Sequence, residues 1–391
     1  MLTVVSEART YYISSSSGND SNAGTSPSSP WKSLTKLYNS WSSITAGDSI
    51  LLKRGDTFAP SSVSNRGVIE IPKDKSGNAN GYITIGAYGS GSKPVVSNSN
   101  VSSFSYGVYA KTLSYFVIRD LKITGGMYFF PGDGDLGAHH VKLLNLELEG
   151  SSLLFLNPYQ PANTPEPNVG KPLHHIEVGY CVFRNSTGED AFNIAETQGF
   201  NWFHHNQFYN VEEEAIDMGG GDSSIVEYNL VSGTTANGIK LHSQFMRQTN
   251  TIVRGNVINL GAGNYSYPLA FEVTQGGKVY NNTFVGVQYA AFLGWLHANP
   301  PLISNPKNNS LDMSNNEFYN NIFYGTVIVG IAKGVTYTYR NGSKATITHD
   351  EIWDDNYFSN NIFYTPYDTK KIRVFYYSGT ITYNASVAPY G

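Results

Sequence analysis

The feature that most constrains this chain is a short pattern that recurs through its central part. Each copy has a small residue, an apolar residue, a variable residue and a second apolar residue. The copies are Ala191–Ile194, Ala215–Met218, Gly238–Leu241 and Ala270–Val273, and their variable residues are Asn193, Asp217, Lys240 and Glu272. Repeats of this length with alternating apolar residues are typical of a coiled sheet that adds one rung per turn. We therefore expect the variable residues to stack on the outer face, about 4.8 Å apart.

A second column supports this register. Asparagines recur two positions before an apolar residue, at Asn206, Asn229, Asn256, Asn282, Asn316 and Asn361. Asparagine tolerates left-handed backbone and bonds neighbouring backbone groups, so these residues are expected to form an internal amide ladder. Because the two columns run in step, the sequence predicts an all-β fold, a right-handed parallel β-helix. The handedness follows from the general crossover rule.

The chain of 391 residues is expected to form one β-helix domain. We expect an N-terminal cap and first rungs over about 1–60, the solenoid over about 61–325, and C-terminal rungs with a β-rich cap over about 326–391. Residues 30–38 predict a short capping helix with Leu34, Leu37 and Tyr38 on one face. Two long loops, 157–172 and 297–312, are expected to leave the solenoid, and the first of them to wall a groove beside the charged column.

Composition excludes several partners. The net charge of −4 provides no basic surface, so we expect no nucleic-acid partner. No apolar run is long enough to span a membrane. The single cysteine, Cys181, lies in an apolar run and is expected to be a buried core residue. Ser6–Ala8 has the small-x-small pattern found where a signal peptide is trimmed, so we expect a secreted protein, acting as a monomer.

Three segments carry a charged cluster, and they are Glu189–Asn193, Glu212–Asp217 and Asn237–Leu241. Together they resemble the calcium-dependent pectate lyases of polysaccharide lyase family 9. The resemblance implies one calcium ion bound by Asp190, Glu213, Glu214 and Asp217, and Lys240 as the catalytic base. Two of these positions, Glu213 and Glu214, hold aspartate in the family, and the spacing from the pair to the lysine is shorter here.

The residues also permit a physical interpretation without the family. Asp190 and Glu214 each lie three positions before the charged column, so they occupy equivalent places in successive rungs. Four or five carboxylates within two rungs repel one another unless they are neutralised. A calcium ion with 6–8 oxygen ligands would relieve this repulsion. The alternative is a surface salt-bridge ladder in which Lys240 and Arg247 neutralise the carboxylates, which stabilises a fold little.

For Lys240 the alternatives are a structural ion pair with Asp217 or Glu272, and abstraction of the C5 proton of a uronate. The second would lead to β-elimination, with the substrate carboxylate neutralised by calcium. His242, two residues further on, and Arg247 are expected to hold a substrate carboxylate.

Other candidates are weaker. The pairs His139–His140, His174–His175 and His204–His205 are interpreted as stacked turn positions rather than zinc sites. Asp133 and Asp135 are interpreted as turn residues. Stacking on sugar rings is an option for three aromatic residues, Tyr265, Tyr267 and Trp295.

The function that the sequence predicts first is a secreted lyase acting on an acidic polysaccharide, with pectate or polygalacturonate as the leading substrate. The first alternative is a non-catalytic polysaccharide-binding or surface β-helix protein. The second is a metal-independent glycoside hydrolase that uses Asp190, Glu214 or Asp217.

Overall fold

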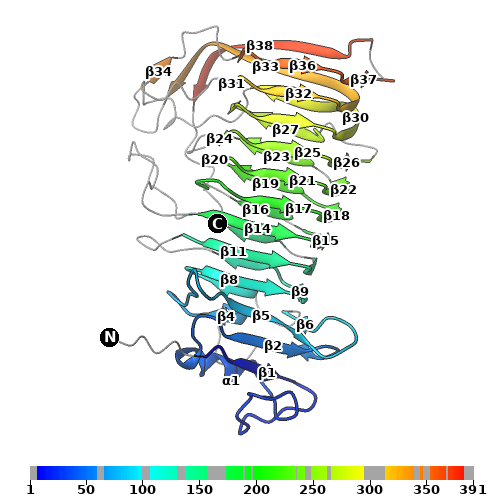
Figure 1. The fold of residues 1–391 in the computed structure, drawn as a ribbon. Coiled ribbons are helices and arrows are strands. Elements are labelled where there is room, and N and C mark those ends of the chain that lie inside the picture. Colours follow the sequence, from blue (N-terminus) through cyan, green and yellow to red (C-terminus); the bar gives the residue numbers. More distant parts are fainter. Residues whose placement is uncertain are drawn as a thin grey trace.

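The protein is a parallel β-helix, as the sequence predicts. The computed structural model describes residues 7–59, 66–98, 106–129, 137–150, 152–155, 173–187, 190–194, 197–234, 236–242, 248–261, 266–294, 313–338, 344–346, 353–366 and 369–382. Short strands stack rung upon rung, from β1 at the N-terminal end to β38 at the C-terminal end (Figure 1). The predicted loops 157–172 and 297–312 and the turn with Asp133 and Asp135 lie outside the described residues.

One face of the helix is a sheet in which every pairing between neighbouring strands is parallel. Its strands, in spatial order, are β1 (Thr10–Ile13), β2 (Ser49–Lys53), β5 (Ile83–Tyr88), β8 (Ser114–Arg119), β11 (His139–Leu144), β14 (His174–Gly179), β17 (Trp202–His204), β21 (Ile225–Glu227), β25 (Ile252–Arg254), β29 (Lys278–Tyr280), β32 (Glu317–Tyr319) and β36 (Tyr357–Ser359). We call it the first sheet.

Two further columns of strands complete each turn. The second sheet contains β3 (Thr57–Phe58), β6 (Val95–Val96), β9 (Lys122–Thr124), β12 (Glu147–Glu149), β15 (Val182–Arg184), β18 (Gln207–Val211), β22 (Leu230–Thr234), β26 (Val257–Asn259) and β37 (Ile362–Tyr364). The third sheet contains β4 (Gly67–Ile71), β7 (Tyr106–Ala110), β10 (Met127–Phe129), β13 (Leu153–Phe155), β16 (Phe192–Ile194), β19 (Ile216–Gly219), β23 (Ile239–His242), β27 (Leu269–Glu272) and β38 (Ile372–Thr382). Two long strands, β30 (Thr283–Gly294) and β33 (Ile322–Thr338), run through both sheets and join them.

Smaller elements fill the corners and the N-terminal end. The remaining strands are β20 (Gly221–Asp222), β24 (Gln248–Thr249), β28 (Thr274–Gln275), β31 (Met313–Ser314), β34 (Lys344–Thr346) and β35 (Trp353–Asp354). Helix α1 (Leu34–Tyr38) lies beside β1 at the N-terminal end and buries Leu34 and Leu37, whereas Tyr38 is 37% exposed (Figure 1). A single-turn 3₁₀ helix, η1, spans Trp41–Ser43. Among the described residues, no helix has the length and apolar character needed to cross a membrane.

The interior is a continuous apolar core of side chains from all three sheets. Aromatic rings stack along it from rung to rung, for example Phe183 on Phe208 at 4.6 Å and Phe284 on Phe323 at 5.4 Å between ring centroids. Each fully buried phenylalanine stabilises the fold by roughly 1.5–3 kcal/mol. Cys181 is buried in this core, as predicted, and burial raises the pKa of its thiol to about 12.

The predicted amide ladder is present, with one correction. The ladder runs in the order Asn206, Asn229, Asn256, Asn282, Asn321 and Asn361. Each asparagine after Asn206 accepts hydrogen bonds at Oδ1 from the backbone N–H and Nδ2 of the asparagine one rung earlier. The prediction placed Asn316 in this ladder, but Asn316 pairs with Asn356 in a separate one. Both Asn316 and Asn321 precede a phenylalanine by two positions, so the pattern alone does not distinguish them.

The predicted outer column is correct for three residues and wrong for the fourth. Asn193 pairs with Asp217, and Asp217 pairs with Lys240, but the next partner of Lys240 is Ala270 rather than Glu272. A shift of two residues keeps the same side chains on the same face of a strand, so the alternation could not reveal it. Leu241 pairs with Phe271, and the next residues on the two strands are His242 and Glu272. Glu272 therefore corresponds to His242 and not to Lys240.

Candidate functional site

A charged cluster lies on the outer side of the third sheet, where β16, β19 and β23 stack. The residues that flank the charged positions, such as Ile216, Met218, Ile239 and Leu241, are in the core. Because side chains alternate along a strand, Asp217 and Lys240 point away from that core. They are nevertheless well covered, since Asp217 is only 3% exposed. A charge at such a position is costly unless it is paired or bound to an ion.

A second column precedes these strands and adds more carboxylates. Asp190, Glu214 and Asn237 each lie directly before the small residue of the repeat, and their rungs are joined by backbone hydrogen bonds from Ala191 to Glu214 and from Ala215 to Asn237. This confirms that Asp190 and Glu214 occupy equivalent places. One carboxylate oxygen from each of Asp190, Glu214 and Asp217 lies within 4.8 Å of those of the other two.

Amide groups hold two of these carboxylates in place. The side chain of Asn193 donates a hydrogen bond to Asp190 Oδ2 at 2.7 Å, and the backbone N–H of Glu214 donates to Oδ1 at 3.0 Å. Asn237 Nδ2 donates to Glu214 Oε1 at 2.9 Å. The sequence prediction gave these asparagines no role, although the position of Asn237 before the third copy of the repeat was a usable signal.

Two cationic side chains face Asp217 from the next rung. Lys240 Nζ donates to Asp217 Oδ2 at 3.1 Å and lies 3.5 Å from Glu214 Oε1. His242 Nε2 lies 2.8 Å from Asp217 Oδ1, but the contact lacks the alignment of a hydrogen bond. Asp217 Oδ1 and His242 Nδ1 are therefore buried polar atoms without a hydrogen-bonding partner in the described part of the chain.

The environment shifts the pKa values of the two aspartates in opposite directions. Burial, with Asp217 and Glu214 beside it, raises the pKa of Asp190 to about 10, so this carboxyl is protonated at neutral pH. Burial also opposes the charge of Asp217, but Lys240 and His242 outweigh it and hold the pKa of Asp217 well below its usual range. Burial likewise opposes the charge of Lys240, yet Asp217, Glu214, Glu272 and Asp190 together raise the pKa of that ammonium above its ordinary value.

The structure brings together four of the residues predicted for the site, Asp190, Glu214, Asp217 and Lys240, and places His242 beside them. Glu213, predicted as a ligand, is exposed and is not part of the three-carboxylate group. Partial burial, and then its neighbour Glu214, raise the pKa of Glu213. Arg247 lies outside the described residues, as do Tyr265 and Trp295. Tyr267 packs against Tyr289 and Phe292.

The histidine pairs were predicted as stacked turn positions, but they lie at strand ends: His139, His140, His174 and His175 begin β11 and β14, and His204 ends β17. His139 pairs with His174 at the start of β11 and β14, whereas His204 pairs with Gly179 at the opposite end of the first sheet. His140, His175 and His205 all have positive φ angles of 53–55°.

Comparisons with known proteins associate this fold with carbohydrate-active enzymes. No family model matches the chain. A stretch of 143 residues is 37% identical to the lacto-N-biosidase of Bifidobacterium longum subsp. longum, and the match covers 31% of this chain and 8% of that protein. The chain therefore spans a small fraction of this curated relative.

Solved structures extend the likeness over most of the chain. The structure of a lacto-N-biosidase of glycoside hydrolase family 136 from Eubacterium ramulus matches with a TM-score of 0.58, at 15% identity, over 90% of this chain and 68% of that one. The pectate lyase Pel9A matches with a TM-score of 0.45, at 16% identity, over 94% and 81%. At these identities the likeness is one of fold. It does not select a reaction.

Proposed function

We propose that this protein is a secreted, monomeric lyase that cleaves a uronate-containing polysaccharide, with pectate or polygalacturonate as the leading candidate. The reaction is β-elimination at the Asp190–Glu214–Asp217 cluster, with Lys240 as the base. The observation that carries this proposal is the convergence of three carboxylates from two successive rungs within 4.8 Å, with a lysine 3.1 Å from one of them.

The donor set suits calcium, which prefers carboxylate and carbonyl oxygens. Burial, together with the neighbouring carboxylates of Asp217 and Glu214, raises the pKa of Asp190 and keeps its carboxyl protonated. A bound cation would relieve this repulsion between carboxylates. Asp190, Glu214 and Asp217 would hold the ion. When bound, calcium supplies charge that neutralises the substrate carboxylate and so makes the adjacent C–H more acidic.

Lys240 is positioned to take that proton. Its ammonium is kept charged by four carboxylates that together outweigh the effect of burial. Once the charge of those carboxylates is compensated, burial remains, and burial lowers the pKa of a lysine. The side chain then becomes a base at alkaline pH, which a lysine can do and an arginine cannot. His242 Nε2 lies 2.8 Å from Asp217 Oδ1 and would hold that carboxylate in place beside Lys240.

The test is the ultraviolet absorbance of unsaturated product formed from polygalacturonate, measured with calcium and with chelator. We expect product only with calcium, and none from Lys240→Ala. Lys278→Ala is the matched control, because Lys278 forms an exposed ion pair with Glu317 on the first sheet. Absence of product from pectate, alginate and glycosaminoglycans alike would exclude the lyase and favour the polysaccharide-binding alternative.

A glycoside hydrolase is the second candidate, favoured by the sequence match to lacto-N-biosidase. Hydrolysis needs one protonated and one ionised carboxyl group, and Asp190 and Asp217 have those states. However, a general acid works best when its pKa is near the working pH, and a value of about 10 is far above neutrality. A saturated product whose formation is unaffected by chelator would identify this alternative.

A further inference from the structure

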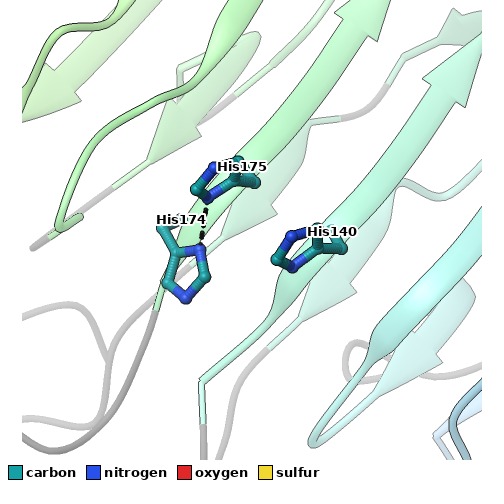
Figure 2. A group of neighbouring side chains, drawn as sticks. All are labelled: His140, His174 and His175. Atoms are coloured by element: carbon teal, nitrogen blue, oxygen red, sulfur yellow. Dashed lines mark hydrogen bonds between the residues drawn. The ribbon is translucent and has the colours of Figure 1, made fainter. Parts of the chain in front are cut away.

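The first sheet carries a second cluster of ligand-type side chains, on the strands β11 and β14. One ring nitrogen from each of His140, His174 and His175 lies within 4.8 Å of those of the other two. Figure 2 shows His174 and His175 facing each other, with His140 on the neighbouring rung. We infer that these three histidines form a binding site for a divalent transition-metal ion such as Zn²⁺ or Cu²⁺.

The contact between His174 and His175 is the first argument. Their Nδ1 atoms are 2.6 Å apart, so two lone-pair positions meet and only one proton can lie between them (Figure 2). An imidazole nitrogen that holds no proton is a metal ligand. An ion at this point would bind both nitrogens, at about 2.0–2.1 Å each for zinc.

In a second pair, His204 and His205, the ring nitrogens that meet have the hydrogen-bonding partners that they need without a metal ion. Their Nδ1 atoms are 3.1 Å apart, and His204 Nε2 lies 3.5 Å from Glu177. The carboxylate fixes the proton of His204 on Nε2, so His205 can donate to Nδ1 of His204. Within the described residues, neither Nε2 of His174 and His175 has such a carboxylate. That pair therefore lacks the partner that fixes its protons.

A third histidine, His140, also distinguishes the pair His174–His175 from the pair His204–His205. His140 stacks on His175 with ring centroids 4.6 Å apart, and its own partner His139 stacks on His174 at 5.2 Å. His205 instead has Tyr180 and Tyr228 as its ring neighbours. Among the described residues, only the cluster on β11 and β14 combines a histidine pair with a further histidine in reach.

The site is accessible. His175 is exposed, and His140 and His174 are half-buried. The rings of His140 and His175 lie within 5° of parallel, so one of them must rotate for both lone pairs to reach the same ion. Side chains of exposed residues change rotamer within nanoseconds, and such a change would unstack His175 from His140 and Phe200.

The ligand type selects the metal. Imidazole suits zinc, copper and nickel, whereas calcium and magnesium require oxygen ligands. The site therefore differs in specificity from the carboxylate cluster. An ion bound here would join β11 to β14, two successive rungs of the first sheet. Because it binds only the folded chain, it would raise the melting temperature.

The test is calorimetric titration of the full chain with Zn²⁺ and with Cu²⁺, in buffer saturated with calcium to occupy the carboxylate cluster. The variants are His140→Asn, His174→Ala and His175→Asn, and the control is His205→Asn. Asparagine tolerates the left-handed backbone of His140, His175 and His205, so these three substitutions are matched. Circular dichroism establishes that each variant is folded.

We expect one ion per chain, a higher melting temperature with zinc, and at least a tenfold loss of affinity in each of the three variants, since even an outer-sphere partner changes affinity by ~10–100-fold. His205→Asn should bind as the parent does. Unchanged affinity in His140→Asn or His175→Asn would overturn the proposal, as would an equal loss in His205→Asn. These two surface variants decide the question if His174→Ala does not fold.

Discussion

The amide ladder and the carboxylate cluster are both stacks of polar side chains, but they differ in how the side chains are satisfied. In the ladder each asparagine donates hydrogen bonds from its backbone N–H and Nδ2 to Oδ1 of the next one, as Asn229 does to Asn256. In the cluster, unlike residues occupy neighbouring rungs, and Asp217 Oδ1 and His242 Nδ1 make no hydrogen bond within the described residues. Repetition of one residue thus stabilises the solenoid, whereas departure from it leaves charge and unused ligand atoms where chemistry can occur.

The largest expected effect comes from removing the base while keeping its charge. Lys240→Arg retains a cation beside Asp217 and Glu214, but arginine does not lose its proton in proteins. We expect lyase activity to fall by about 10²–10⁴-fold, the usual contribution of a general base. The melting temperature should change little. The measurement is the initial rate of product formation with calcium. Activity retained in Lys240→Arg would show that the lysine acts through its charge alone and not as a base.

The next effect tests the ladder. Asn256 Oδ1 accepts from the backbone N–H and Nδ2 of Asn229, and its own Nδ2 donates to Val226 O and Asn282 Oδ1. Asn256→Ala leaves buried donors and acceptors unpaired, so we expect a loss of about 2–4 kcal/mol in the free energy of unfolding. Denaturant titration with and without calcium measures it.

The control for the ladder is Asn210→Gly. Asn210 is exposed, has a φ angle of 53° that glycine also adopts, and makes one long side-chain contact to Asn185. We expect a change within about 0.5 kcal/mol. A loss as large as that of Asn256→Ala would mean that turn conformation, and not internal hydrogen bonding, makes these asparagines important.

The fold was predictable because its sequence pattern is repeated many times. The register of each residue on its rung was not predictable. Alternating apolar residues around Asn193, Asp217 and Lys240 indicated both the β-helix and the outward face. The same alternation placed Glu272 in the wrong register, because a two-residue slip preserves the face. Likewise Asn316 and Asn321 each precede an apolar residue by two positions. Only their hydrogen-bonding partners show which of them belongs to the main ladder.

The site was predictable as far as it follows the repeat. Asp190 and Glu214 were placed correctly because both precede a copy of the pattern. The opposite pKa shifts of Asp190 and Asp217 could not be predicted, because they depend on how deeply each carboxyl is buried and on which side chains point at it. The grouping of His140 with His174 and His175 likewise required the register of β11 on β14.

A smaller effect concerns pH in the calcium-free protein. The carboxyl of an unfolded aspartate loses its proton near pH 4, whereas folded Asp190 keeps it to about pH 10. Between these values the folded state holds one proton more, so the free energy of unfolding falls as pH rises, by at most about 1.4 kcal/mol per pH unit. Melting temperatures in chelator between pH 5 and 9 should show this slope. Asp190→Asn should flatten it, and Asn256→Ala, which changes no charge, should not.

A last comparison separates two adjacent glutamates that the family resemblance treats alike. Glu214 belongs to the three-carboxylate group and accepts a hydrogen bond from Asn237, so Glu214→Gln should weaken calcium binding by about a hundredfold or more. Glu213 is exposed and outside the group, so Glu213→Gln should weaken binding by less than about fivefold, as expected for an exposed charge. Calcium titrations of both variants measure the difference. Equal losses would mean that Glu213 moves into the site when the ion binds, and that the metal-free arrangement of this turn differs from the loaded one.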